Sequence, residues 1–105
     1  ISTTAGILFF YSQFKNKKNP LRNIRLLKDE LTLGSAKEGT DTIIDSPVIS
    51  RFHAKITKEG TDYYLQDLNS TNGTSVNGKL LGYRDKVKLN PNDEIMFANE
   101  SYRFV

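Results

Sequence analysis

The sequence predicts an all-β fold, in which short strands form two sheets packed face to face as a β-sandwich. Short runs of alternating apolar and polar residues recur along the chain, with turn residues between them every six to twelve positions. No stretch keeps apolar residues at the helical spacing of about 3.6 residues. The length of 105 residues fits one domain, which we expect to span residues 1–105 as an excerpt of a longer protein.

The first predicted strand covers residues 7–14, within the most apolar run of the chain. Its aromatic content favours a strand, with Ile7, Phe9 and Tyr11 on one face. The apolar run is too short for a helix to cross a bilayer of about 30 Å. One alternative stays open, the end of a truncated membrane helix followed on its cytoplasmic side by Lys15, Lys17 and Lys18.

The other predicted strands are short and lie between turn residues. We interpret 24–28 and 31–33 as two pieces of one edge strand, because Asp29 and Glu30 interrupt the pattern. In chain order, the strands that follow are 42–45, 53–58, 61–67, 74–77, 80–81, 85–89, 95–98 and 101–105.

The alternation of apolar and polar residues and the residue types at the turns support the prediction of the central strands. Ala54 and Ile56 share one face of their strand, as do Tyr63 and Leu65 in the next. We place the hairpin turns at three dipeptides, of which Asn-Gly is the strongest two-residue signal. They are Glu59-Gly60, Asn77-Gly78 and Asn99-Glu100.

The positive charge is concentrated in one segment. The formal net charge is +3, and residues 15–28 contain no acidic residue. Such a segment fits either a nucleic-acid or anionic-membrane patch, or a solvated loop with the polar face of one strand. We favour the second interpretation, because no aromatic residue lies among the basic residues to stack on bases. The basic residues are Lys15, Lys17, Lys18, Arg22, Arg25 and Lys28.

Composition excludes several kinds of site. The chain has no cysteine, which excludes disulfides, thiolate metal sites and cysteine nucleophiles. A single histidine leaves no histidine metal cluster. We therefore expect no metal and no cofactor.

Two loops are richer in hydrogen-bonding side chains than the rest of the chain. Residues 47–53 read Pro-Val-Ile-Ser-Arg-Phe-His, and residues 67–74 read Asp-Leu-Asn-Ser-Thr-Asn-Gly-Thr. Small hydroxyl and amide side chains commonly cap their own turns. Here six consecutive residues are hydrogen-bonding residues or glycine, and such a run suits a loop that presents hydrogen-bonding groups outward. Loops at one end of a sandwich lie side by side, so the two are expected to form one site.

At these loops the sequence resembles the forkhead-associated (FHA) domain. The matching strings are residues 50–54, Ser-Arg-Phe-His-Ala, and residues 67–74, continued by Val76-Asn77-Gly78. The leading Leu33-Gly34 and the late turn at residues 92–95 also fit. The resemblance covers residues 24–105, with residues 7–14 serving as the first strand. It implies a sandwich of about eleven short strands that recognises phosphothreonine in an extended peptide.

The resemblance places ligand contacts at five positions, which are 35, 50, 51, 71 and 72. Ser50 donates its hydroxyl to a phosphate oxygen, and Arg51 lies near the phosphate. Thr71 lies at the phosphate and helps to accept the threonine methyl group. Asn72 hydrogen-bonds the ligand backbone. Position 35, where the family usually has an arginine that grips the phosphate, is Ser35 in this chain.

The resemblance also assigns supporting roles around the site. His53 braces the loops internally, Gly73 supplies the positive φ of its turn, and Gly34 lets its loop come close. Lys37 and Arg51 are candidates to supply the charge that Ser35 lacks. The loops around 47–48 and 82–84 are expected to contact ligand residues after the phosphothreonine.

Other functions are weighed against phosphopeptide recognition. Ser50, His53 and Asp67 contain the residue types of a nucleophile triad, but no nucleophile-elbow pattern surrounds Ser50, so we expect no enzyme. Ser35 makes a phosphate-independent interaction module the main alternative.

The expected partner is a phosphothreonine-containing protein and not a nucleic acid. Membrane contact is expected only through the parent chain, and the default state is a monomer. The expected location is the cytoplasm, with the nucleus or the cytoplasmic face of a membrane as alternatives.

Overall fold

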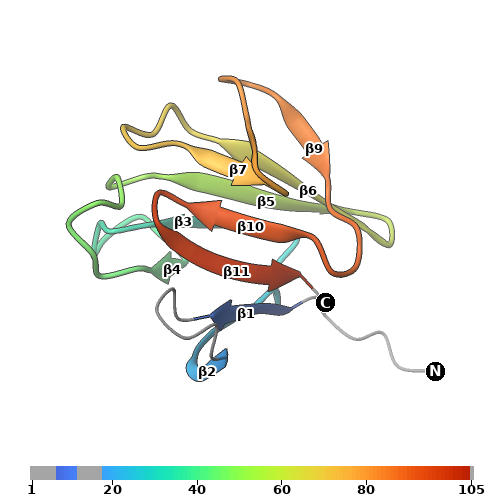
Figure 1. The fold of residues 1–105 in the computed structure, drawn as a ribbon, viewed down its shortest axis with the longest axis horizontal. Helices are drawn as coiled ribbons and strands as arrows, with labels where there is room; N and C mark the ends of the chain where they lie inside the picture. The colour runs from blue at the N-terminus through green and yellow to red at the C-terminus, as the bar shows by residue number, and fades with distance from the viewer. Residues whose placement is uncertain (1–6, 12–17, 105) are drawn as a thin grey trace.

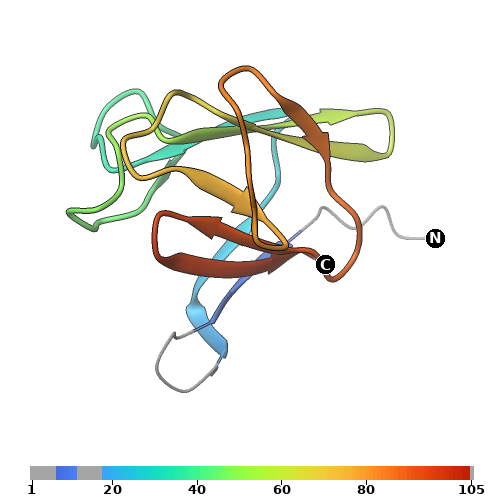
Figure 2. The same cartoon turned by 45° about the horizontal axis from the view of Figure 1, so that its top comes forward.

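The computed structural model describes residues 7–11 and 18–104, which form two packed β-sheets without helices (Figures 1 and 2). The six-stranded sheet has the order β2-β1-β11-β10-β7-β8, and the five-stranded sheet has the order β4-β3-β5-β6-β9. The strands are β1 (Ile7–Tyr11), β2 (Lys18–Arg25), β3 (Glu30–Gly34), β4 (Thr42–Ile43), β5 (Ala54–Glu59), β6 (Asp62–Asp67), β7 (Thr74–Val76), β8 (Lys79–Leu80), β9 (Lys86–Lys88), β10 (Glu94–Phe97) and β11 (Glu100–Phe104). The predicted all-β sandwich is confirmed.

The hairpin of β5 and β6 follows directly from its sequence. Ala54, Ile56, Tyr63 and Leu65 alternate with more exposed residues and point into the core. The connecting turn is Gly60–Thr61, one residue after the predicted Glu59-Gly60, and Gly60 has a φ of +65°. The two strands pair along their whole length, which fixes the position of the loops at either end.

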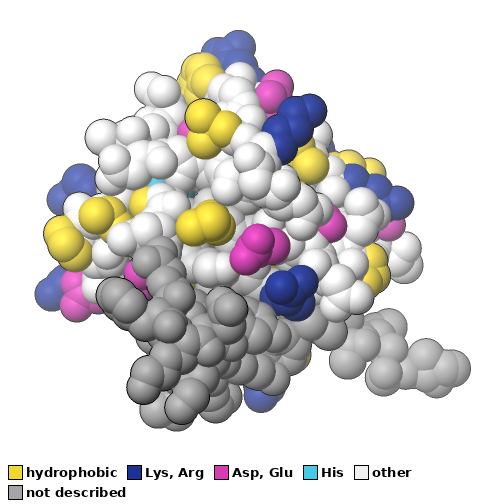
Figure 3. Space-filling model, in the orientation of Figure 1, with side chains coloured by type: hydrophobic (Ala, Val, Ile, Leu, Met, Phe, Trp, Pro, Cys, Tyr) yellow, Lys and Arg dark blue, Asp and Glu magenta, His cyan; other side chains and the backbone are white. Residues whose placement is uncertain are grey.

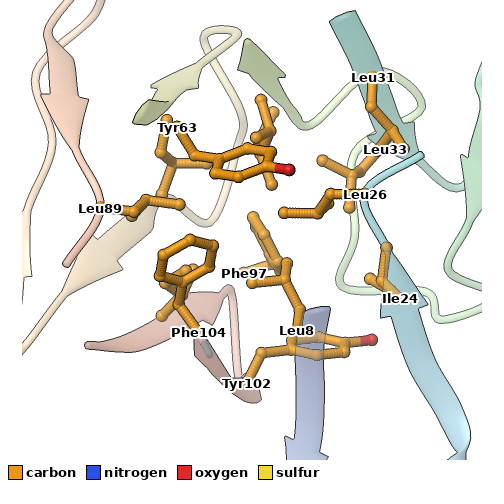
Figure 4. Close-up of a cluster of buried hydrophobic side chains, with 14 of the residues drawn as sticks. Leu8, Ile24, Leu26, Leu31, Leu33, Tyr63, Leu89, Phe97, Tyr102 and Phe104 are labelled. Carbon is orange, nitrogen blue, oxygen red and sulfur yellow. The ribbon is translucent and has the colours of Figure 1, made fainter. Parts of the chain in front are cut away.

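A continuous apolar core lies between the sheets (Figure 4). Burying these side chains stabilises the sandwich by roughly 1.5–3 kcal/mol for each large one. Edge-to-face packing of Phe97 on Tyr102, with ring centroids 5.5 Å apart, joins β10 to β11. Side chains from both sheets contribute, including Leu8, Leu26, Leu33, Ile56, Leu65, Ile95, Phe97 and Tyr102.

The interpretation of 24–28 and 31–33 as one edge strand is wrong. Residue 24 belongs to β2, at the edge of the six-stranded sheet, whereas β3 lies between β4 and β5 in the other sheet. Residues 26–29 cross from one sheet to the other, with Leu26 only 2% exposed between them. Burial of this leucine, rather than continuity of the strand pattern, determines the path of the chain.

Several smaller boundaries also differ from expectation. The first strand ends at Tyr11, and the rest of the predicted 7–14 strand lies outside the described residues. The turn between β10 and β11 is Ala98–Asn99, one residue before the predicted position, with Ala98 at a φ of +56°. The Asn77-Gly78 turn is confirmed, and both residues have positive φ as a type I′ turn requires.

Three loops gather at one end of the sandwich, on the left of Figures 1 and 2. They follow β3, β4 and β6, and they cover residues 35–41, 44–53 and 68–73. This arrangement brings the two polar loops of the sequence to the same end of the domain.

Within residues 7–11 and 18–104 there is no helix that is long and apolar enough to cross a membrane.

Candidate functional site

A cleft lies where the three loops meet, and it encloses about 510 Å³. Five of the residues singled out from the sequence line it together: Ser35, Ser50, Arg51, Thr71 and Asn72. Pro47, Val48, Ile49 and Asn69 complete the lining. Residues distant in sequence therefore share one surface.

His53 connects the two polar loops from behind the cleft. Its side chain is fully buried, and its Nδ1 accepts a hydrogen bond from the Ser50 N–H at 3.0 Å. Because Nδ1 is an acceptor, the proton is on Nε2, which donates to the Gly73 carbonyl at 2.9 Å. The ring also packs edge-on against Phe97, with centroids 5.9 Å apart. His53 thus holds the Ser50 loop and the Gly73 loop at a fixed separation.

Gly34 allows the loop after β3 to approach the Ser50–Arg51 backbone. A Cβ atom at this position would lie 1.9 Å from the Arg51 carbonyl oxygen. Two backbone hydrogen bonds close the contact, from Ser35 N–H to the Ser50 carbonyl and from Ala36 N–H to the Arg51 carbonyl. The approach therefore depends on a residue without a side chain.

The loop at residues 68–73 is shaped by a buried carboxylate. Asp67 accepts hydrogen bonds from the Ser70 hydroxyl and N–H and from the Thr74 hydroxyl. Ser70 Oγ in turn accepts the Gly73 N–H, and Gly73 has a φ of +88°. The side chains of Asp67, Ser70 and Thr74 thus stabilise the loop itself.

The same network sets the ionisation of Asp67. Burial on its own raises the pKa of Asp67, but the hydrogen bonds from Ser70 and Thr74 outweigh it, so that the pKa lies below its ordinary value. The carboxylate is therefore charged at neutral pH and holds the loop in its observed form.

Ser50 has a hydroxyl proton available to a ligand. Its Oγ accepts the Thr71 N–H at 2.9 Å, which leaves the hydroxyl hydrogen to point elsewhere. The contact also joins the two loops directly at the cleft. A negatively charged oxygen placed in the cleft could accept from this hydroxyl.

Asn72 makes a second bridge between the loops. Its Nδ2 donates to the Val48 carbonyl at 2.8 Å. Among the described residues no hydrogen bond engages its Oδ1, so this oxygen is available as an acceptor for a donor in the cleft.

The two basic residues predicted to lie near the phosphate line the cleft and a second hollow that adjoins it. Arg51 is exposed and lines the cleft of Ser50 and Thr71, but it also lines a second hollow beside it. Lys37 lines only the second hollow, together with Ala36 and Glu38, and Ser35 is shared by both. At this end of the molecule, basic, acidic and hydrophobic side chains lie close together (left of Figure 3).

The triad interpretation does not fit the geometry. His53 binds the backbone N–H of Ser50 rather than its hydroxyl, and it has no solvent exposure. Asp67 binds Ser70 and Thr74. A nucleophile–base contact of the kind that hydrolases need is therefore not formed by these three residues.

Three residues of the predicted site loops have roles that sequence reasoning did not assign to them. Asp67 organises its loop, Val48 supplies the carbonyl that binds Asn72, and Asn69 lines the cleft with a φ of +59°. The signal for Asp67 was its spacing of three and seven residues from Ser70 and Thr74, which suits an Asx-type turn.

Part of the basic segment at residues 15–28 lies outside the described residues. Residues 12–17 are not among the described residues, whereas Arg25 and Lys28 are exposed. Lys28 pairs with Asp41 at 2.6 Å, and this contact lowers the pKa of Asp41. In residues 7–11 and 18–104 there is also no group of histidine and acidic side chains that could hold a metal ion.

Known proteins resemble this chain in both sequence and structure. The chain is 38% identical over 64 residues to the transcriptional regulatory protein EmbR of Mycobacterium tuberculosis, which is 61% of this chain and 16% of EmbR. It is 31% identical over 83 residues to the glycogen accumulation regulator GarA of Mycolicibacterium smegmatis, which is 78% of this chain and 51% of GarA. The chain therefore spans only part of these relatives.

Solved structures of known proteins also superpose on this chain. EmbR of M. tuberculosis in complex with a low-affinity phosphopeptide superposes with a TM-score of 0.78 at 27% identity, covering 96% of this chain and 24% of that one. Yeast Pml1 superposes with a TM-score of 0.82 at 19% identity over 96% of this chain and 78% of that one, which shows a shared fold. The sequence model of the FHA domain matches residues 31–98, and the chain belongs to the FHA domain family.

Proposed function

We propose that this domain binds phosphothreonine in a partner protein and so mediates a phosphorylation-dependent interaction. The observation that carries the proposal is the convergence of Ser50, Arg51 and Thr71 on one cleft, held in place by the buried His53. The EmbR structure with its phosphopeptide supports the proposal through a homologous fold.

The donors of the cleft match the chemistry of a phosphate monoester. Phosphothreonine carries nearly two negative charges at neutral pH and three strong acceptor oxygens. The Ser50 hydroxyl and the Arg51 guanidinium can donate to these oxygens, each through a charge-assisted bond of about 1.5–3 kcal/mol. Ordering of the peptide offsets part of this gain, so we expect dissociation constants in the micromolar range or weaker.

Asn72 is proposed to hold the ligand backbone. Its amide group is oriented by the bond to Val48, so its Oδ1 is fixed before a ligand arrives. A peptide N–H that donates to this oxygen would keep the chain extended beside the phosphate. Fixing one such contact in advance lowers the entropic cost of ordering the peptide.

The test is an oriented phosphothreonine peptide library, captured beside its unphosphorylated counterpart. Ser50→Ala should abolish enrichment of phosphothreonine, because it removes the donor in the cleft and the acceptor of the Thr71 N–H. Ser75→Ala is the matched control, since Ser75 lies half-buried on β7 and outside the cleft. Equal capture from both libraries would refute the proposal.

A second candidate function rests on Ser35. The absence of the family arginine weakens the phosphate site, and the domain could then recognise an unphosphorylated partner through the same loops. Enrichment of specific unphosphorylated sequences that Asn72→Ala abolishes and Ser50→Ala leaves unchanged would favour this alternative.

A further inference from the structure

The second hollow is a direct extension of the cleft. It is lined by Ser35, Ala36, Lys37, Glu38 and Arg51, and it encloses about 410 Å³. Ser35 and Arg51 form the boundary between the two, since both residues line both spaces. A peptide that places its phosphothreonine beside Ser50 would therefore bring a neighbouring side chain within reach of Lys37.

The loop that forms the hollow is fixed by backbone contacts. Ser35 and Ala36 donate their N–H groups to the carbonyls of Ser50 and Arg51, and the Thr40 hydroxyl donates to the Ala36 carbonyl at 2.5 Å. Beyond it, the ring of Phe52 lies close beneath Gly39. The hollow therefore exists before any ligand binds, and filling it requires little rearrangement.

The basic groups of this hollow have no acidic partner within the described part of the chain. Lys37 and Arg51 are exposed and form no ion pair there, although Glu38 lines the same hollow. Four other lysines on the sandwich are paired with acids. These pairs are Lys28–Asp41, Lys55–Glu30, Lys86–Glu59 and Lys88–Asp62.

We propose that the second hollow binds a second anionic group of the ligand, located close to the phosphothreonine, through Lys37. The inference rests on the proposed function, because it requires a phosphothreonine in the neighbouring cleft. The shared chemistry is a negatively charged side chain, either a carboxylate or another phosphate. Arg51, at the boundary, faces both anions and favours their simultaneous binding.

This inference differs from the role that sequence reasoning gave Lys37. If Lys37 replaced the missing family arginine, it would contact the phosphothreonine phosphate itself. Its position in the adjoining hollow, apart from Ser50 and Thr71, instead separates it from that phosphate by Ser35 and Arg51. The two roles give different results with peptides of different flanking charge.

The experiment compares three sets of peptides by fluorescence anisotropy with this chain. The first peptide has one phosphothreonine and neutral flanks, the second set moves one glutamate through the three positions on either side, and the third set replaces that glutamate with a second phosphothreonine. We expect at least one position at which glutamate tightens binding by about threefold or more, as an exposed ion pair allows. The second phosphate should tighten binding further.

Lys37→Ala should remove this gain while leaving affinity for the neutral-flank peptide nearly unchanged. Lys88→Ala is the control, because Lys88 is also an exposed lysine but lies on β9, away from the hollow. Glu38→Gln should increase the preference for a flanking anion, since it removes the one acidic group of the hollow.

Three outcomes would overturn the inference. Equal weakening of all phosphopeptides by Lys37→Ala would assign the lysine to the primary phosphate. Absence of any preference for flanking anions, with normal binding of the neutral peptide, would leave the proposed function intact and refute the second site. Absence of phosphopeptide binding altogether would refute the proposed function and, with it, this inference.

Discussion

Replacing Ser35 with arginine should tighten phosphopeptide binding. Ser35 is half-buried at the boundary between the cleft and the second hollow, and its N–H donates a hydrogen bond to the Ser50 carbonyl. A longer side chain can therefore extend into the open cleft without disturbing that bond. The new guanidinium would stand beside Arg51 and could bind a phosphate through two parallel donors.

The expected gain in binding free energy is the difference between two opposing contributions. Two charged hydrogen bonds contribute at least about 3 kcal/mol before costs are subtracted. Ordering an arginine side chain costs up to about 2 kcal/mol. The net gain is therefore about 1–2 kcal/mol, or roughly 5- to 30-fold in the dissociation constant.

Isothermal titration calorimetry with one phosphothreonine peptide measures this gain. Ser35→Gln is the matched control, because it adds length and hydrogen-bonding capacity without charge. Arg51→Ala should weaken binding less in the Ser35→Arg background than in the native chain, because two guanidiniums then share one phosphate. If Ser35→Arg and Ser35→Gln bind equally, position 35 does not face the phosphate and the reasoning is refuted.

Four further predictions address the site and its support. Asn72→Ala should weaken peptide binding by tenfold or more, about 1.4 kcal/mol, while urea unfolding shows a folded domain; a large loss of stability with unchanged affinity would make Asn72 a purely structural residue. Gly34→Ala should destabilise the fold by about 3 kcal/mol or more in the same assay, because its Cβ would collide with the Arg51 carbonyl. The stability that Asp67 provides should be present above its ordinary pKa of about 3.9 and lost as the pH falls through its lowered folded pKa; Asp67→Asn should flatten the acid limb of the pH–stability curve. Phosphothreonine should bind about fivefold tighter than phosphoserine in matched peptides, by roughly 1 kcal/mol for one methyl group, and equal affinities would exclude a methyl slot beside Thr71.

Local sequence determines most of the strands but not all of their partners. Alternation specified β5 and β6 correctly, because one face of each is buried and a shift by one residue would expose it. The segment from residue 24 to residue 33 was misassigned because its path depends on a long-range contact. Leu26 is buried between the sheets, and no local pattern distinguishes such a crossing from an interrupted strand.

The site shows the same division between local and long-range information. The motif residues could be named from the sequence, and positive φ at Gly73 follows from its turn. Two features could not be inferred in this way. The burial of Asp67 turns Ser70 and Thr74 inward, because a buried carboxylate requires donors, so fewer side chains face outward than the sequence suggested. The path of the loop after Gly34 decides that Lys37 lines the adjoining hollow.

Positions that maintain the fold of this site are distinct from those that set its affinity. Gly34 and His53 act through buried contacts, so changing either one displaces a whole loop. Ser35 contributes to the fold through its backbone, and Lys37 is exposed. Charge at positions 35 and 37 can therefore change with little effect on folding, because the cleft is formed without them. A serine where the family usually has an arginine is thus compatible with an intact fold, and under the proposed function it leaves Arg51 to bind the phosphothreonine phosphate and Lys37 to bind a second anion.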